Sequence, residues 1–177
     1  MIADILHPLE AVLETSFTPE AVCVVLAEIF HVQSSEVALL RLEQDRLHFL
    51  YPKHLQSTGA IPISSSAVAA HTALSKKAEI FNNFAFVKHA RIFESIRPLG
   101  AEVSEEHLAL PIQKLMSVPI IENVESTVLG VIQISRKGTE ARFIPDFTRE
   151  EMHDLELAAD LLATAPFLLS LQHDPCF

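Results

Sequence analysis

The segment from Leu115 to Arg136 constrains the fold of this chain more than any other part of the sequence. An apolar run at 115–121 precedes a polar stretch at 122–126, and the side chains of residues 127–135 then fall alternately into two sets, one apolar and one mixed. Two strand-like runs around a short polar connection are typical of a β-hairpin. Because successive side chains of a strand point to opposite faces, one face of the second strand should be wholly apolar. That face holds Val128, Gly130, Ile132 and Ile134.

The opposite face of this hairpin is mixed, because Ser117 and Gln133 fall on it. Such a face suits the floor of a shallow pocket that other segments close, and an ordinary solvated sheet face would look similar. Pro119 has no N–H to donate, so it should mark a bulge or a strand end where no ladder bond is lost. The hairpin therefore predicts one core face and one face with a possible role in binding.

Helical patterns are found at both ends of the chain. Ile5, Leu6 and Leu9 recur at helical spacing and predict an amphipathic first helix. Thr18 followed by Pro19 has the form of an N-cap and a first helical position, and the helix that it opens should run to His31.

A C-terminal helix should be capped by Thr148 and end near Ala165, before Pro166. It carries two apolar stripes, one of Met152, Leu155, Ala159 and Leu162, the other of Leu157, Leu161 and Leu168. One stripe should cover the sheet. The other could pack against the first helices or against a second subunit.

Shorter elements fill the middle of the chain, where apolar runs are brief and separated by turn residues. Ser64, Ser65 and Ser66 offer N-caps for a short helix. The expected elements are a hairpin at 34–43 and 46–51, strands at 61–63 and 78–81, helices at 67–75 and 87–95, and an acidic loop at 100–107.

In these segments the chain resembles the GAF family, the small sensory and ligand-binding domains of phosphodiesterases, phytochromes and many bacterial regulators. The resemblance covers roughly residues 18–165, and its pieces lie in the family's order at 61–63, 78–80, 115–120, 130–134 and 147–158. It implies an α/β (α+β) fold with a central antiparallel sheet of five or six strands. N- and C-terminal helices should cover one face, and short helices and loops the other. We expect an N-terminal helix at 1–17, a GAF-like domain at 18–165 and a C-terminal tail at 166–177.

The resemblance also implies a role. We expect a cytoplasmic, stand-alone sensor of an unidentified small molecule in signal transduction, without catalysis, dimeric through its terminal helices and acting on a partner signalling protein. Ligand binding would order a cover formed by residues 82–107. One alternative is a structural or interaction domain whose pocket is filled by its own Phe side chains. A less favoured alternative is a thiol-dependent enzyme that uses Cys23.

The candidate ligand contacts lie on the mixed sheet face and in its expected cover. His71 and His89 fall on the short helices that should roof the pocket, where a haem or an anion could use one of them. Buried amides such as those of Asn82 and Asn83 need partners, although a turn could also satisfy them. The Phe residues at 81–93 can wall a ligand or simply pack as core. The full set is His71, Asn82, Asn83, Phe84, Phe86, His89, Phe93, Ser117 and Gln133.

Composition excludes several classes of function. The formal charge of −10 is spread along the chain and argues against nucleic acid, which requires clustered Lys and Arg. The first 13 residues lack the basic start of a signal peptide, and no apolar run approaches the ~20 residues of a membrane span. Nine His without an HExxH motif, and two distant Cys, give no support to a metal site. Four Gly in the whole chain leave no phosphate-binding loop.

Within the resembled family, cyclic-nucleotide-binding members carry an Asn-Lys pair after the last strand, and a Phe and an Asp-Glu pair at the start of the final helix. This chain has Ser135-Arg136, Phe147 and Glu151-Met152 at those places. One feature is kept in kind, an ion pair between Arg136 and Glu151 that would tie the last strand to the last helix. Members that bind bilin or reduce methionine sulfoxide use mid-domain Cys residues that this chain lacks, which disfavours both activities.

Overall fold

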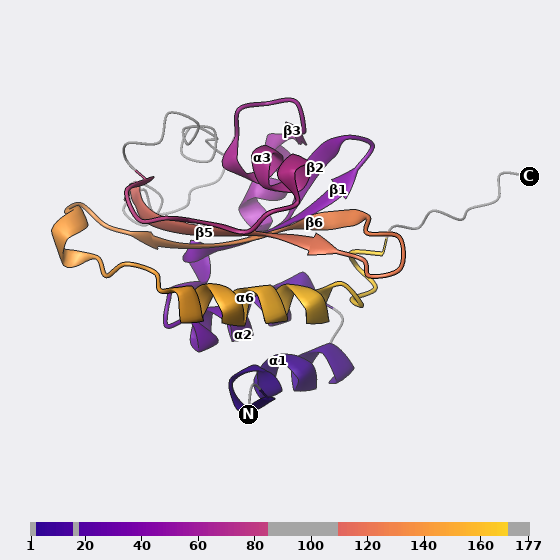
Figure 1. The fold of residues 1–177 in the computed structure, drawn as a ribbon, viewed down its shortest axis with the longest axis horizontal. Helices are drawn as coiled ribbons and strands as arrows, with labels where there is room; N and C mark the ends of the chain where they lie inside the picture. The colour runs from indigo at the N-terminus through magenta and orange to yellow at the C-terminus, as the bar shows by residue number, and fades with distance from the viewer. Residues whose placement is uncertain (1–2, 16–17, 85–109, 170–177) are drawn as a thin grey trace, which may run out of the picture.

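A computed structural model describes residues 3–15, 18–84 and 110–169 of the chain. Its centre is a six-stranded sheet in the order β3-β2-β1-β6-β5-β4, in which every neighbouring pair is antiparallel (Figure 1). The strands are β1 (Val37–Glu43), β2 (Arg46–Tyr51), β3 (Ile61–Pro62), β4 (Glu79–Phe81), β5 (Ile112–Ile121) and β6 (Val128–Lys137). The predicted α+β architecture is confirmed.

The helices divide between the two faces of the sheet. On one face lie α1 (Ala3–Thr15), α2 (Pro19–Ile29) and α6 (Arg149–Leu162), with α1 outermost (Figure 1). On the other lies α3 (Val68–Ser75), together with the 3₁₀ turn η2 (Lys53–Thr58) that follows β2. Two further 3₁₀ turns, η1 (Ser34–Glu36) and η4 (Ala141–Phe143), precede β1 and α6. This is the predicted placement of terminal helices on one face and short helices on the other.

The β5–β6 hairpin forms as predicted, but its alternation is shifted at one end. Ile132 and Ile134 pack into the core beneath α2 and α6, as expected. The register shifts between Ile120 and Ile121, so that Val128 packs with the cluster of the α3 face instead. The prediction for Val128 is therefore wrong, because a local irregularity in the ladder moves a side chain to the opposite face.

Pro119 lies in β5 opposite Val131, next to that irregularity. On the other edge of β5, pairing with β4 runs only from Leu115 to Ser117. Pro119 is thus beyond the end of the β4 ladder, where its missing N–H costs no bond to that strand. This agrees with the prediction that it marks a strand end or bulge.

The helix face contains one continuous apolar core. Thr18 caps α2 through its side chain, and Thr148 and Glu151 form a capping box at the start of α6. The first stripe of α6, including Leu155 and Leu162, is fully buried against the sheet. From the second stripe, Leu157 and Leu161 are partly buried against the same core, and α1 contacts α6. The first helices therefore take up part of that second stripe.

The α3 face is built from shorter pieces. The β1–β2 turn places Gln44 and Asp45 at positive φ, as a tight hairpin requires. The N-cap of α3 is Ala67, without a side-chain cap, whereas the sequence suggested Ser64 to Ser66. Ser65 instead accepts a bond from the Ala67 N–H, so it supports the turn just before the helix.

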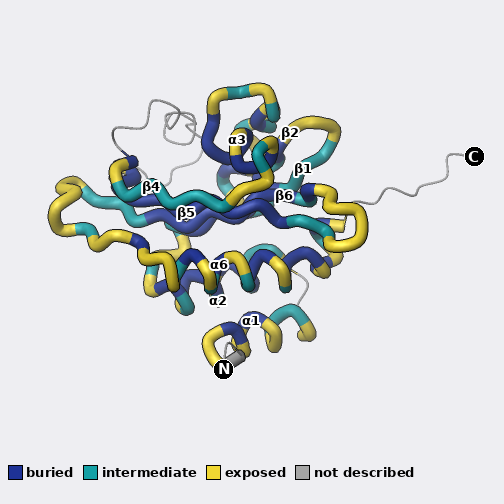
Figure 2. Tube along the Cα trace, in the orientation of Figure 1, coloured by how far each residue is buried: buried dark blue, intermediate teal, exposed yellow. Residues whose placement is uncertain are grey.

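Acidic residues concentrate on the helix face, which corrects the expectation that they are evenly spread. Within α1, α2 and α6 there are ten Asp and Glu and one Arg, a formal charge of −9 out of −10 for the whole chain. The surface of these helices is exposed on the side away from the sheet (Figure 2). Among the residues that the structure describes, no helix combines the length and the apolar character that crossing a bilayer requires.

Candidate functional site

A row of polar side chains crosses the sheet beneath α3. Cross-strand pairing aligns Glu79 of β4 with Ser117 of β5, and Ser117 with Gln133 of β6. Gln133 pairs in turn with Ala38 of β1, whose side chain packs in the same cluster as the alanines of α3. Glu79, Ser117 and Gln133 therefore form one row on the face that α3 covers.

The row is joined to α3 by a chain of buried hydrogen bonds. Gln133 donates from Nε2 to Ser117 Oγ over 3.0 Å, and Ser117 Oγ lies 2.7 Å from Thr72 Oγ1 of α3. Thr72 donates its only hydroxyl proton to the Val68 carbonyl over 2.9 Å. The Ser117 hydroxyl must then be the donor to Thr72. Each group thus donates to the next in one direction, from Gln133 to Ser117, from Ser117 to Thr72, and from Thr72 to the helix backbone.

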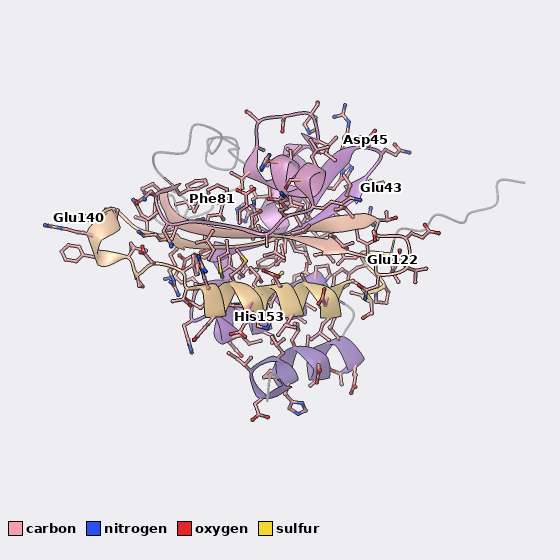
Figure 3. All side chains as sticks on the ribbon, viewed as in Figure 1. Glu43, Asp45, Phe81, Glu122, Glu140 and His153 are labelled. Atoms are coloured by element: carbon pink, nitrogen blue, oxygen red, sulfur yellow. The ribbon has the colours of Figure 1, made fainter. Side chains whose placement is uncertain are left out.

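An apolar row lies next to the polar one. Phe81 of β4 pairs with Leu115 of β5, two residues from Glu79 and Ser117 respectively. Phe81 is labelled in Figure 3. Its ring meets the ring of Phe84 edge to face, with centroids 6.5 Å apart and planes at 75°. Val68, Phe84, Ile112 and Leu115 are buried together, and Phe81 is partly buried against them. The floor beneath α3 therefore combines one polar row with an aromatic and aliphatic row.

The structure separates the predicted site residues. It brings Ser117 and Gln133 together, and it places Phe84 in the adjoining apolar cluster. His71 is 62% exposed and binds Glu79 through Nε2 at 2.9 Å, so it lies at the margin of the face. Asn83 is exposed. Phe86, His89 and Phe93 lie outside the described residues, as do the predicted helix at 87–95, the loop at 100–107 and most of the proposed cover.

Thr72 is a buried polar residue of this face that was not among the predicted site residues. It is fully buried, and it is the link between the sheet and α3. The available signal was its position four residues after Val68 on a short helix that is otherwise mostly alanine and apolar. A hydroxyl at that spacing shares the sheet-facing side of the helix.

Asn82 belongs to a second polar cluster, at the start of α6. Its side chain exchanges two hydrogen bonds with the Phe147 backbone, at 2.9 and 3.1 Å. Lys114 of β5, whose side chain is 8% exposed, donates to the Asn82 carbonyl and to Asp146, at 2.6 and 2.7 Å. Asn82 is therefore satisfied by the chain itself, in a clamp that joins the end of β4 to the start of α6.

The predicted ion pair between Arg136 and Glu151 is confirmed, with 2.7 Å between Nη2 and Oε2. Arg136 also donates to the carbonyls of Pro145 and Asp146, and its guanidinium lies 4.0 Å from the centroid of the Phe147 ring. The last strand is thereby tied to the last helix, as expected. Lys114 and Arg136 both act on this side of the sheet, away from the polar row.

Cys23 is fully buried in α2. Burial raises the pKa of its thiol well above the ordinary range, and the neighbouring charge of Glu20 adds to the increase. Because the thiolate is the reactive form of cysteine, Cys23 is poorly suited to act as a nucleophile. Ser117 is equally unsuited, since its proton is donated to Thr72 and its side chain is buried.

The family model for the GAF domain matches residues 19–165. The chain belongs to the GAF domain family. That match includes all six strands as well as α2, α3 and α6, and thus both rows beneath α3. No curated protein matches the sequence.

Solved GAF structures share this fold at low sequence identity. The GAF domain of a phosphoenolpyruvate-protein phosphotransferase from Coxiella burnetii has a TM-score of 0.66 at 12% identity, covering 93% of this chain and 91% of that one. The corresponding domain from Acinetobacter has a TM-score of 0.64 at 12% identity, covering 92% and 90%. The free methionine-R-sulfoxide reductase from Neisseria meningitidis, solved with its substrate, has a TM-score of 0.65 at 13% identity, covering 94% and 89%.

The reductases correct one prediction. The sequence analysis expected no catalysis, yet several of the structures that share this GAF fold are enzymes that reduce free methionine sulfoxide. Membership of the fold therefore gives no ground for excluding enzymatic activity, and that prediction was wrong. At these identities the likeness shows the fold alone, so it assigns no reaction to this chain.

Proposed function

We propose that this GAF domain is a regulatory module in signal transduction that binds a small molecule on the α3 face of its sheet. The ligand would lie over the polar row of Glu79, Ser117 and Gln133 and against the apolar row of Phe81 and Leu115. Ligand binding and signalling are the general roles of the family to which the chain belongs.

The observation that carries this proposal is the buried hydrogen-bond chain from Gln133 to Thr72. Buried hydroxyl and amide groups cost free energy unless they are paired, and apolar side chains of similar volume would fill the same space at no such cost. Three buried polar side chains nevertheless meet here, Ser117 and Gln133 on the sheet and Thr72 on α3. Gln133, at the amide end of this network, is 6% exposed.

The proposal includes a partner, because a sensor must pass its state to another protein. Homodimerisation through the terminal helices is part of the proposal, as is a cytoplasmic location. The clamp of Asn82 and Lys114 offers a physical route, since it joins the end of β4, at the margin of the α3 face, to the start of α6. A ligand that shifts the end of β4 would bias the position of α6.

Native mass spectrometry of the freshly purified chain tests the proposal. The sample is measured folded and then denatured, so that any bound small molecule is released and weighed. We expect a defined bound mass, which Ser117→Ala reduces because it breaks the hydrogen-bond chain. The control is Thr164→Ala, which removes a hydroxyl just after α6, away from the α3 face, that donates to the Leu161 carbonyl. An equal loss in both variants, or no bound mass at any stage, would count against a site at Ser117.

A second candidate function is supported by the packing of Phe84. Its side chain is 3% exposed and fills space beside Val68 and Leu115, while the Ser117 hydroxyl is already bonded within the chain. These contacts favour an interaction module whose face is filled by its own side chains. Such a module would show no bound mass, and Phe84→Ala would then open a cavity that accepts small apolar probes.

A further inference from the structure

We infer that the α3 face selects a ligand whose polar group donates hydrogen bonds through N–H, as an amine, amidine or amide does, and whose body is aromatic or aliphatic. This inference rests on the proposed function and adds the chemical class of the ligand. It excludes carboxylates and phosphates as the group that meets the polar row. Two properties of the polar row decide the ligand class: the hydrogen-bonding capacity that it has left, and its charge.

The first step is the direction of the buried hydrogen-bond chain. The hydroxyl protons of Ser117 and Thr72 are both committed, to Thr72 and to the Val68 carbonyl respectively. One Nε2 proton of Gln133 is committed to Ser117. These bonds commit both hydroxyl protons of the row, whereas the carboxamide oxygen and the second Nε2 proton of Gln133 take no part in the chain. A ligand at this end of the row meets a carbonyl acceptor beside one N–H donor, so the charge of the row decides between ligand classes.

The second step is the carboxylate at the other end of the row. Glu79 is the cross-strand neighbour of Ser117, and its side chain is 33% exposed. One of its oxygens binds His71, which leaves acceptor capacity on a group that only accepts when it is ionised. A ligand amine or amidine would find a charged acceptor here, and a ligand anion would be repelled.

The third step is the location of the basic residues. Lys114 of β5 and Arg136 of β6 act on the helix side, where they are engaged with Asp146 and Glu151. Of the residues that the structure describes in the polar row, none is Lys or Arg. The row thus lacks the cation that a buried carboxylate or phosphate group requires as a partner.

The fourth step is the apolar row, which sets the body of the ligand. Phe81 is only partly buried, next to the closed cluster of Phe84 and Leu115. An aromatic or aliphatic body placed over Phe81 would complete that cluster, while its polar group reached Glu79 two residues away on the same strand. The two rows together are therefore complementary to a ligand with one apolar end and one hydrogen-bond-donating end.

Three probes of the same size and shape test this inference on the full chain. Benzamidine, benzamide and benzoate share one ring and differ in the polar group, which is a cationic donor, a neutral amide and an anion. Dissociation constants are measured by titration with NMR detection of the ring protons. We expect benzamidine and benzamide to bind at least ten-fold more tightly than benzoate. Glu79→Gln should remove the advantage of benzamidine over benzamide.

The control for this substitution is Glu140→Gln. Glu140 is another surface carboxylate that binds a basic side chain, Arg142, but it lies in the connection before α6. Glu140→Gln should leave the dissociation constants of all three probes unchanged. If benzoate binds as tightly as benzamidine, the chemical class is wrong although a binding site exists. If no probe binds, the small molecule released in native mass spectrometry decides. A carboxylate or phosphate without N–H donors overturns the inference, and a molecule with N–H donors supports it. The absence of both probe binding and bound mass overturns the proposed function as well.

Discussion

The two faces of the central sheet are built on different principles. Beneath α1, α2 and α6 the sheet contributes to one continuous apolar core, in which Leu9, Leu39 and Leu155 are fully buried. Beneath α3 the apolar residues form two separate clusters, and the polar row of Ser117 and Gln133 lies on the same face. The first arrangement maximises burial and the second retains polar groups at a cost. Under the proposed function, stability and recognition would lie on opposite sides of the same strands.

Formal charge is also distributed unevenly along the chain. The helices of the core face carry a formal charge of −9. Their inner side receives Lys114 and Arg136 from the sheet, which bind Asp146 and Glu151 at the entry to α6. The substitutions below compare the two faces, beginning with the one expected to have the largest effect.

The largest effect is expected from truncation in the core, with Leu155→Ala compared with Leu115→Ala. Both leucines are buried, at 0% and 3% exposure, but Leu155 lies in the continuous core and Leu115 in a small cluster. Such truncations cost about 2–5 kcal/mol, and more where the surroundings cannot collapse into the cavity. We expect Leu155→Ala near the upper end and Leu115→Ala near the lower end. The free energy of unfolding in urea measures both. Equal losses would mean that the two faces are packed with equal rigidity.

A smaller effect is expected at the clamp, with Lys114→Met compared with Arg142→Met. Removing the buried Lys114 ammonium leaves the Asn82 carbonyl without its charged donor, which should cost about 1–3 kcal/mol of unfolding free energy. Arg142 binds Glu140 with its side chain 75% exposed, and such pairs contribute about 0–1 kcal/mol. Thermal and urea unfolding of both variants provide the comparison. If the Arg142 variant loses as much as the Lys114 variant, the clamp contributes nothing beyond an ordinary surface pair.

These comparisons also mark what the sequence could predict. The hairpins and the caps at Thr18 and Thr148 depend on local signals, and each was predictable from residues close in sequence. The Arg136–Glu151 pair was expected from the resemblance to the GAF family, and the structure contains it. The inward turn of Asn82 toward Phe147 was not predictable, because 65 positions separate the two residues and only the assembled sheet brings them together.

The site on the α3 face was predictable only in part. Alternation along β5 and β6 placed Ser117 and Gln133 on one face, and the structure pairs them. The role of Thr72 depends on how a short helix is rotated above the sheet, which no local pattern fixes. His71, one residue earlier, was expected over the sheet but lies at its margin for the same reason. Successive residues of a helix differ by about 100° in direction, so a small error in rotation exchanges a buried residue for an exposed one.

The next effect concerns the pH dependence of the core face, through Cys23. Burial raises the pKa of the Cys23 thiol, so the native chain keeps its proton where the unfolded chain, with a pKa of about 8.5, has lost it. Stability from this group is therefore complete below pH ~8.5 and declines above it, by up to about 1.4 kcal/mol per pH unit. The free energy of unfolding between pH 8 and pH 10 should fall more steeply in the parent chain than in Cys23→Ala. Identical slopes in the two proteins would show that the Cys23 thiol ionises as readily in the native state as in the unfolded state.

The smallest effect concerns the charge of the core face. Glu156 and Asp160 are exposed acidic residues four positions apart on α6, and like charges at that spacing destabilise a helix by about 0.2–0.5 kcal/mol. Glu156→Gln combined with Asp160→Asn should therefore raise the unfolding free energy slightly at low ionic strength. The matched control, Asp45→Asn with Glu125→Gln, removes the same charge from hairpin turns and should change little, since Asn tolerates the positive φ of position 45.

In 1 M salt, where the Debye length is about 3 Å, the difference between these two double variants should vanish. Its persistence there would mean that side-chain packing rather than charge is responsible.

The same pair of variants bears on the proposed homodimer. Two copies that meet through this helix layer bring like charges together, so salt or the α6 double variant should strengthen their association in sedimentation experiments. If neither changes the association and the chain still dimerises, its copies meet through another surface, and the helix layer is free for a partner of opposite charge.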